Sequence, residues 1–474
     1  MLSLHNTLTR TVEPVRPLVP GTVSMYSCGP TVYRPVHIGN LRSFLLGDLI
    51  RRALVWTGLS VRQVMNITDV GHMTDEVYDR GEDKMLLAAA DEGLSPAEIA
   101  AKYEAAFHRD SARLGIVPAE VYPKASDHVG AMIELIGRLL ERGHAYVDGG
   151  TVYYDVTSFP GYGRLSHNSL DQLRAGHRLE AVDHHKRHPA DFILWKAAGP
   201  RRVVRFDSPW GEGYPGWHIE CSAMSIAYLG ERFDIHTGGV DLQFPHHEDE
   251  IAQSEGALGH PVVTTWVHGD HLLFSGQKMA KSSGNVWTLD RLEEEGHRPL
   301  DFRYLCLTSR YRRQLRFSPG ALAAAGKARA RLAAQLAEWG EPAGPAESPA
   351  AKEWDLRFRD AVLNDLDFPR ALTAVWGLAG DDGVGAAEKA ALVRDWDRVL
   401  GLGLDDAAPP AAGDDLPAGA AELLDARATA RVERDWAESD RLRDALLQLG
   451  VAVTDTKDGQ AWAVRAPAPP GTDR

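Results

Sequence analysis

The sequence contains little cysteine: only Cys28, Cys221 and Cys306 occur in 474 residues, far apart and odd in number. This scarcity excludes a disulfide framework and favours a reducing, cytoplasmic setting. Long apolar runs are also lacking, and without a stretch of about 18 apolar residues no membrane span is expected. The first ten residues lack the basic-then-apolar plan of a secretory signal, so we expect no export.

Net positive charge is lacking as well. The formal net charge of −14 argues against nucleic-acid binding, because phosphate contacts need Lys and Arg. One segment, residues 302–337, departs from this balance: it has no acidic residue but contains Arg303, Arg310, Arg312, Arg313, Arg316, Lys327, Arg329 and Arg331. Two interpretations stay open, a solvated helix face and a nucleic-acid-facing stripe on an otherwise acidic protein.

The order of hydrophobic patterns predicts a parallel sheet. Residues 23–27 read as a buried strand, 41–57 as a helix that stops at Gly58, and 61–67 as the next strand. A strand, helix and second strand form a βαβ unit, which begins a doubly wound sheet. Further along, a capping box at Ser95 predicts a helix to about Leu114. Additional helices are expected over about 127–142 and 217–229, and from Pro245; strands over about 233–236 and 262–267; hairpins over 145–154 and 451–464.

Two distant segments are suited to phosphate groups. The first, residues 35–41, contains His37-Ile38-Gly39-Asn40 and opens directly into a helix pattern, whose backbone N–H groups attract anions. The second, residues 276–285, places Lys278 and Lys281 between glycines, where they suit a polyphosphate. Either segment alone is weak evidence, but their order along the chain is informative.

One candidate metal site can be read from local spacing. His246 and Glu250 are four residues apart at a predicted helix start, so they share a helix face and could bind one metal ion. Spacing does not join Cys28 or Cys221 to this pair, and an inert buried thiol is the commoner state of such a cysteine. The residues alone therefore leave the role of the cysteines open. A histidine-rich cluster at 183–188 is predicted to be a solvated or RNA-near loop without metal.

In their order, the two phosphate-handling segments resemble the H-I-G-H and K-M-S-K-S signatures of class I aminoacyl-tRNA synthetases. Within that class, the chain resembles the cysteinyl-tRNA synthetase family over nearly its whole length. The segments that carry this resemblance are Cys28-Gly-Pro-Thr-Val-Tyr33, Asn66-Ile-Thr-Asp69, Pro189-Ala-Asp-Phe-Ile-Leu-Trp-Lys196, Gly216-Trp-His-Ile-Glu-Cys-Ser-Ala-Met224 and Phe244-Pro-His-His-Glu-Asp-Glu250.

The sequence departs from the family pattern at a few positions. Ala280 stands where the second signature usually has serine, which removes one loop hydroxyl but keeps both lysines. Asn40 replaces the last histidine of the general class I signature, although H-I-G-N is common in this family. The segment from Asp69 to His72 differs from the Asp-rich version of many relatives, so the role of His72 stays open.

The resemblance implies one zinc ion held by Cys28, Cys221, His246 and Glu250. Zinc accepts a substrate thiolate as a further ligand far better than a neutral hydroxyl. Cysteine and serine differ by one atom, and a hydrophobic pocket discriminates poorly between such similar side chains. The metal is therefore expected to provide the specificity for cysteine.

The resemblance also implies the remaining site residues. His37, Asn40, Lys278 and Lys281 are the expected catalytic residues, and together with Gly39 they bind ATP, which Mg²⁺ accompanies. The expected cysteine-binding residues are Gly29, Thr31, Thr68, Trp217 and Asp241. The expected partners are L-cysteine, ATP and tRNA(Cys), with no membrane, and we expect a monomer.

The expected fold class is α/β: a Rossmann-type doubly wound parallel-sheet catalytic domain with an inserted α+β subdomain, then an α-helical bundle and a small C-terminal anticodon-binding domain. In the last domain, Trp462 either stacks on an unpaired base or fills the core of a small hairpin, and we favour the core. The predicted limits are 1–116 and 211–270 for the halves of the catalytic domain, 117–210 for the insertion, 271–317 for the signature-loop and stem-contact region, 318–404 for the helical bundle, 405–419 for a linker, 420–465 for the anticodon-binding domain and 466–474 for a disordered tail.

Two other functions compete with this expectation. A cysteine ligase of the mycothiol pathway resembles the same catalytic core but needs no anticodon reader. A paralogue without catalysis would bind nucleotide or tRNA as a regulator. The C-terminal domain argues against the first, and the retained His37, Lys278 and Lys281 argue against the second.

Overall fold

The computed structural model describes residues 1–70, 73–75, 80–168, 185–199, 202–274, 277–278, 286–405, 419–433, 435–449, 451–456 and 459–464. They belong to two compact units, Met1–Leu404 and Asp405–Arg474. The expected α/β fold class with an antiparallel insertion, a helical region and a small C-terminal domain is confirmed. Among the described helices, none combines the length and the apolar character needed to cross a membrane.

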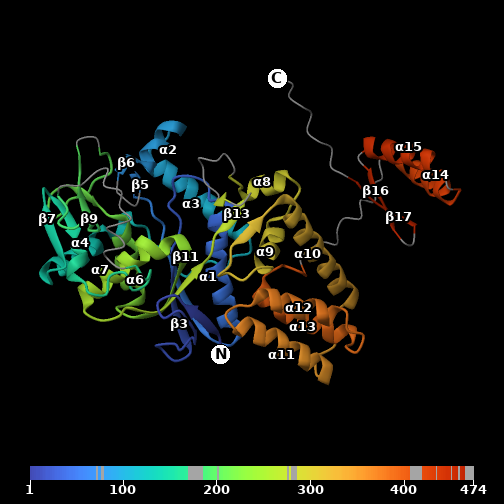
Figure 1. Cartoon of the computed structure of the whole chain (residues 1–474), viewed down its shortest axis with the longest axis horizontal. Helices are drawn as coiled ribbons and strands as arrows, with labels where there is room; N and C mark the ends of the chain where they lie inside the picture. The colour runs from blue at the N-terminus through green and yellow to red at the C-terminus, as the bar shows by residue number, and fades with distance from the viewer. Residues whose placement is uncertain are drawn as a thin grey trace. The chain divides into compact units, whose positions relative to one another are not determined.

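A four-stranded parallel sheet lies at the centre of the first unit (Figure 1). Its strand order is β12–β11–β3–β4, so β4 extends the sheet on one side of β3, and β11 and β12 extend it on the other. The boundary between β3 and β11 is therefore the topological switch point, where ligands bind beyond the carboxyl ends of the strands. The bounds are β3 Thr22–Ser27, β4 Ser60–Met65, β11 Phe233–Gly239 and β12 Val263–Gly269.

Helix α1, Ile38–Trp56, connects β3 to β4 and buries Leu41, Leu45 and Ile50. The helix begins at Ile38, three residues before the predicted start at Leu41, because His37 caps it. The first signature thus forms the opening turn of α1. The helix ends before Gly58, whose φ of +89° favours glycine, as the sequence predicted.

Arg42 fixes the second signature region against α1. Its buried guanidinium donates hydrogen bonds to the carbonyl oxygens of Asp270 and His271, both at 2.6 Å, and of Arg313, also at 2.6 Å. The hairpin that contains Lys278 begins immediately after His271. The planar, fork-shaped guanidinium can serve several carbonyls at once. The strands concerned are β13 Leu272–Phe274, β14 Gln277–Lys278 and β15 Leu315–Phe317.

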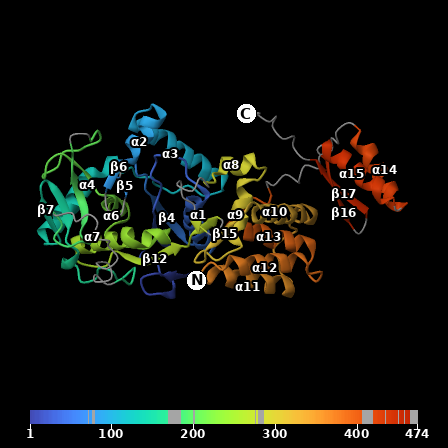
Figure 2. The same cartoon turned by 45° about the horizontal axis from the view of Figure 1, so that its top comes forward.

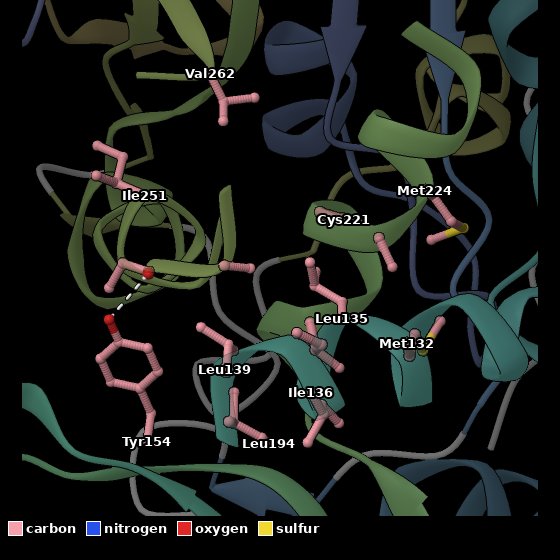
Figure 3. Packing of buried hydrophobic residues seen from close by; sticks show 14 of the residues in the cluster. Met132, Leu135, Ile136, Leu139, Tyr154, Leu194, Cys221, Met224, Ile251 and Val262 are labelled. Carbon is pink, nitrogen blue, oxygen red and sulfur yellow. Dashed lines mark hydrogen bonds between the residues drawn. The ribbon is translucent and has the colours of Figure 1, made fainter. Parts of the chain in front are cut away.

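The insertion contains an antiparallel sheet of order β10–β9–β8–β7 and helix α4, Val129–Glu141. Figure 3 shows apolar side chains of α4 facing Leu194 of the sheet and Cys221 of α6. The Tyr154 hydroxyl donates to the Ala252 carbonyl at 2.9 Å and joins the sheet to α7. One core therefore supports both the insertion and a candidate metal ligand. The bounds are β7 Ala145–Asp148, β8 Thr151–Tyr154, β9 Phe192–Ala197, β10 Gly213–Pro215, α6 Trp217–Leu229 and α7 Glu248–Leu258.

A group of helices follows the second signature region (Figures 1 and 2). Arg303 on α9 is completely buried and donates to Asp48 Oδ2 at 2.6 Å, to the Leu400 carbonyl at 2.6 Å and to the Gly115 carbonyl at 3.1 Å. It thus joins α1, α9 and the end of α13. The bounds are α8 Leu289–Glu294, α9 Pro299–Leu307, α10 Pro319–Trp339, α11 Pro349–Leu363, α12 Phe368–Ala379 and α13 Ala386–Leu400.

The basic segment 302–337 is divided between internal and surface roles. Arg303 and Arg329 are buried, with Arg329 Nε 2.9 Å from Asp301 Oδ1. Arg312 pairs with Asp365 and Arg310 with Asp367. A stripe open to a nucleic acid can therefore include only the exposed Arg313, Arg316, Lys327 and Arg331.

In the described part of the C-terminal unit there are two helices and a hairpin, as predicted. Ala420, Leu424, Leu446 and Val451 form its small core. Trp462 pairs with Val453 in the backbone register, and its side chain lies outside the described part of the chain. The bounds are α14 Ala420–Val432, α15 Trp436–Gln448, β16 Val451–Thr456 and β17 Gly459–Val464.

The remaining described elements surround the sheet and the insertion. Helix α3 begins at the predicted capping box, where Ser95 and Glu98 bond each other. The bounds are β1 Ser3–Asn6, β2 Thr11–Pro14, β5 Met73–Asp75, β6 Arg80–Asp83, α2 Lys84–Glu92 and α3 Pro96–Arg113, with short turns at Ser126–His128, Val156–Ser158, Val240–Leu242 and Gln243–His247.

Candidate metal centre and active-site cleft

A cleft opens at the switch point of the parallel sheet. Cys28 and the turn after β3 form its base, the start of α1 forms one wall, and Trp217 and the turn after β11 form another. Seven of the residues predicted from the sequence line it: Cys28, Gly29, Thr31, His37, Asn40, Trp217 and Asp241. The structure therefore brings together predicted residues from three separate parts of the sequence.

Four buried side chains converge at the base of this cleft. The ligand atoms of Cys28, Cys221, His246 and Glu250 all lie within 4.8 Å of one another. Each comes from a different local context: the end of β3, helix α6, the turn before α7 and the first turn of α7. His246 lies in the π-helical turn Gln243–His247, which leads directly into α7, and its Nε2 is 3.1 Å from Glu250 Oε1, as the predicted i, i+4 spacing requires.

Burial strongly affects protonation in this cluster. Burial raises the pKa of the Cys28 thiol, and the adjacent Cys28 together with burial raises that of Cys221. Burial disfavours a charged His246, but the neighbouring Cys221 and Glu250 outweigh burial and raise the pKa of His246 to about 10. Burial likewise opposes ionisation of Glu250, yet His236 and His246 lower its pKa to about 2.

These groups fit a divalent cation. Among the described side chains, Glu250 Oε1 is buried without a well-formed hydrogen bond, although His246 Nε2 is nearby. A cation held by these four groups would stabilise the thiolate forms of both cysteines and would replace the proton on His246. Two thiolates, one imidazole and one carboxylate are a donor set suited to zinc.

A hydrogen-bonded chain supports His246 from behind. His218 Nδ1 lies 2.8 Å from His246 Nδ1, and His218 Nε2 lies 3.3 Å from Asp249 Oδ2. The Tyr162 hydroxyl donates to Asp249 Oδ1 at 2.6 Å. If His246 binds the metal through Nε2, its Nδ1–H donates to His218 and His218 Nε2–H donates to Asp249. Such outer partners fix the orientation of a metal ligand.

We therefore expect His218→Leu to weaken zinc binding by about 10- to 100-fold, the usual cost of losing an outer partner. Chelator competition would measure the change. His185→Leu is the matched control, because His185 is exposed and pairs with Asp148 outside the cluster. Equal zinc affinity in the two variants would contradict a supporting role for His218.

A second set of four potential ligands overlaps the first: Cys28, His236, His247 and Glu250. His236 Nε2 already lies 2.8 Å from Glu250 Oε2, and His247 Nδ1 lies 2.7 Å from His268 Nε2. His247 Nε2 is 3.2 Å from Cys28 Sγ. We interpret these histidines as the outer shell of the thiolate-rich set, because each ring is engaged by an inner ligand or a neighbouring ring.

Of the expected cysteine-binding residues, Gly29, Thr31, Trp217 and Asp241 line the cleft, whereas Thr68 does not. Gly29 lines the cleft, where a Cβ atom would stand 1.8 Å from the Asn66 carbonyl oxygen, so only glycine fits. The Trp217 ring centroid lies 4.3 Å from that of His246, next to the metal cluster. Thr68 is buried below the cleft, and its hydroxyl donates to Glu220 Oε2 at 2.7 Å. Direct contact of Thr68 with a substrate stays a prediction.

The first signature forms a reciprocal cap at the start of α1. His37 Nδ1 accepts a hydrogen bond from the Asn40 N–H, and Asn40 Oδ1 accepts one from the His37 N–H, both at 3.2 Å. At Gly39, a Cβ atom would stand 2.9 Å from the His37 ring. The cap presents both side chains at the cleft wall, where the helix N-terminus favours anions.

Several predictions concern residues outside the described part of the chain. These are His72, His184, Ala280 and Lys281, while Lys278 is described only through its backbone in β14. Of the histidine cluster at 183–188, His188 accepts a hydrogen bond from the Ala190 N–H at 3.1 Å. Sequence reasoning assigned no role to several residues that line the cleft: Tyr33, Arg34, Ser43, Phe44 and Lys84.

Comparisons with known proteins agree with this geometry. Residues 14–327 match the family model for the class I (C) tRNA synthetase catalytic domain, and residues 413–462 match the cysteinyl-tRNA ligase anticodon binding domain. The fold is similar to that of a Mycobacterium tuberculosis methionyl-tRNA synthetase, with a TM-score of 0.56, 16% identity, and 95% and 99% of the two chains covered. The sheet, the cleft and these matches define a class I aminoacyl-tRNA synthetase.

Curated relatives narrow the class further. The chain is 42% identical to the cysteine–tRNA ligase of Deinococcus radiodurans, with 97% of this chain and 96% of the relative covered. It is also 42% identical to that of Thermus thermophilus, with 97% and 99% covered. The chain belongs to the cysteine–tRNA ligase family.

Proposed function

We propose that the chain activates L-cysteine with ATP and then transfers the cysteinyl group to the 3′ end of tRNA(Cys). This proposal rests mainly on one observation: the same cleft is lined by Cys28 of the metal cluster, by Asp241, and by His37 and Asn40. A thiol, an ammonium group and a polyphosphate each find a complementary group there. Family membership supports the same reaction.

Selection of cysteine rests on the base of the cleft in this proposal. Cys28, Cys221, His246 and Glu250 would hold zinc, which when bound supplies a position for the substrate thiolate that a serine hydroxyl fills poorly. Asp241 lines the cleft and would pair with the substrate ammonium group, and Trp217, which lies next to His246, would exclude water beside the cluster. The buried position of all four ligands limits hydration of the thiolate.

The activation step needs no protein nucleophile. A carboxylate oxygen of cysteine attacks the α-phosphorus of ATP, the bond from that phosphorus to the bridging oxygen breaks, and pyrophosphate leaves. His37 and Asn40 orient the nucleotide at the start of α1, and Lys278 and Lys281 stabilise the leaving charge. Mg²⁺ accompanies ATP. A ribose hydroxyl of the tRNA then attacks the adenylate carbonyl, and AMP leaves.

The C-terminal unit supplies tRNA recognition in this proposal. Trp436 is 57% exposed at the start of α15, and the Arg431 guanidinium carbon lies 5.6 Å from its ring centroid. An exposed aromatic ring next to a cation suits stacking on an unpaired base.

We expect Trp436→Ala to raise the KM for tRNA by about tenfold, since a stacked base contributes about 1–3 kcal/mol. ATP–pyrophosphate exchange should not change, because that step needs no tRNA. Leu447→Ala is the control, since Leu447 is also an exposed apolar residue of α15. An equal KM for tRNA in both variants would remove Trp436 from the recognition surface.

The test of the whole proposal is cysteine-dependent ATP–pyrophosphate exchange, followed in the same preparation by transfer of labelled cysteine to tRNA. Exchange with transfer supports the ligase. Exchange without transfer favours the cysteine ligase of the mycothiol pathway, and the absence of both favours a non-catalytic paralogue. We also propose a monomer and the domain limits predicted above; a stable dimer in light scattering at low concentration would overturn the monomer.

A further inference from the structure

Two cations lie on the cleft wall without a role in the proposed reaction. Arg34 and Lys84 both line the cleft, one from the turn after β3 and the other from the first residue of α2. They approach the same aromatic ring: the Arg34 guanidinium carbon lies 4.9 Å and the Lys84 Nζ 5.6 Å from the Tyr33 ring centroid. Two segments far apart in sequence thus form one cationic group around Tyr33.

The position of Lys84 is fixed by buried contacts. Asp83 caps α2, and its carboxylate accepts from the Met85 N–H at 2.8 Å. Arg202 of the insertion pairs with the buried Asp83 and stacks over Tyr214 at 3.8 Å. The start of α2 is therefore anchored to the insertion, and Lys84 extends from an anchored helix start and not from a loop.

The described lining of the cleft contains charged side chains of both signs. Among the described residues that line the cleft, Asp241 is the single carboxylate, and its charge acts on Cys28 at the metal end. Arg34 and Lys84 are the only described Lys or Arg side chains that line it. An anionic ligand is therefore favoured beside the two cations around Tyr33.

We propose that Arg34 and Lys84 bind a phosphate group of a substrate, with the Tyr33 ring holding the two cations in position. This inference rests on the proposed function and adds a binding subsite to the same cleft. Two phosphate sources are available in that reaction: the polyphosphate of ATP and the phosphodiesters at the 3′ end of the tRNA. Both present oxygen acceptors suited to guanidinium and ammonium donors.

The experiment compares Lys84→Met, Arg34→Gln and Lys84→Arg in the full-length, zinc-loaded enzyme. Lys102→Met is the matched control: it removes the same charge from the neighbouring helix α3, where Lys102 pairs with Glu92 and does not line the cleft. Exchange kinetics report on ATP, and single-turnover transfer from preformed adenylate reports on tRNA. Zinc content and melting temperature report on folding.

We expect Lys84→Met to lose about tenfold or more in kcat/KM in one assay, while Lys84→Arg retains most activity. Loss in exchange assigns the site to ATP phosphates. Loss in transfer alone assigns it to the tRNA. In that case the slope of log KM for tRNA against log salt should fall by about 0.7–0.9 for each lost contact, which a purely structural defect would not cause.

The proposal is overturned if Lys84→Met and Arg34→Gln both stay within about twofold of Lys102→Met in both assays. If Lys84→Met melts early, Arg34→Gln, which lies outside any helix, decides the question. If the wild-type chain shows no exchange, the proposed function is wrong, but this result alone does not decide whether Arg34 and Lys84 bind phosphate. Binding of pyrophosphate and of a short phosphorylated RNA with the tRNA 3′-terminal sequence then tests the phosphate site: equal binding by Lys84→Met and Lys102→Met overturns it.

Discussion

Replacing Cys221 with serine is expected to release zinc and to lower cysteine-dependent exchange by more than about 100-fold, the upper end of what loss of an outer partner costs. Cys221 is almost completely buried and lies within 4.8 Å of the other three candidate ligands. A serine hydroxyl is a poor zinc ligand, and the remaining Cys28, His246 and Glu250 would leave the metal one donor short.

Zinc content by mass spectrometry and exchange kinetics measure the two effects in one preparation. Cys306→Ala is the control, because Cys306 is also a buried free thiol but lies on α9 outside the metal cluster. Full zinc occupancy with unchanged cysteine affinity in Cys221→Ser would rule out Cys221 as a ligand.

Arg303→Met is expected to lower the free energy of unfolding of the first unit by about 3–5 kcal/mol, the usual cost of breaking a buried ion pair. The substitution removes the donor to Asp48 and to the carbonyl oxygens of Leu114, Gly115 and Leu400. The side chain of Asp48 is fully buried, and it would lose its one fully buried cationic partner while keeping Arg52 at 2.9 Å and the Val117 N–H at 2.9 Å.

Denaturant unfolding followed by fluorescence measures the loss. Arg316→Met serves as the control, because Arg316 is exposed on β15 and exposed substitutions usually change stability by about 0.5 kcal/mol or less. Equal unfolding midpoints for the two variants would show that Arg303 does not hold the elements together.

The local pattern of the sequence predicted most of the secondary structure. Helix α6 has the predicted bounds because Gly230 ends it, and α3 starts at the predicted Ser95 cap. The parallel sheet followed from one βαβ unit. The start of α1 was predicted too late, because the N-cap residue is His37, and histidine is not among the common N-cap residues.

Long-range contacts limited the prediction of the site. Spacing linked His246 to Glu250 but not to Cys28 or Cys221, which meet only because β3, α6 and the turn after β11 converge at the switch point. The family resemblance, not the pattern, suggested the full set. The outer histidines and Lys84 had no local signal, because their partners come from distant segments.

The basic segment illustrates the same limit. From the sequence, its cations could form either a solvated helix face or a nucleic-acid-facing stripe, since no acidic residue lies within 302–337. In the fold, Asp48, Asp301, Asp365 and Asp367 neutralise four of them, and three of these carboxylates lie far from their partners in sequence. Charge read along a chain therefore overestimates the charge open to a nucleic acid.

The reciprocal cap between His37 and Asn40 has a consequence for nucleotide exchange. The two residues expected to contact phosphates already bond the N–H groups that a phosphate oxygen would seek. An arriving phosphate can therefore substitute for the protein's own acceptors, and a departing one returns the N–H groups to them. The N–H groups at the helix start would keep hydrogen-bond acceptors in both states. Losing such a cap usually lowers the stability of a helix by about 1 kcal/mol. In the proposed reaction, binding and release of ATP would exchange one set of hydrogen-bond partners for another, and the start of α1 would stay intact between turnovers.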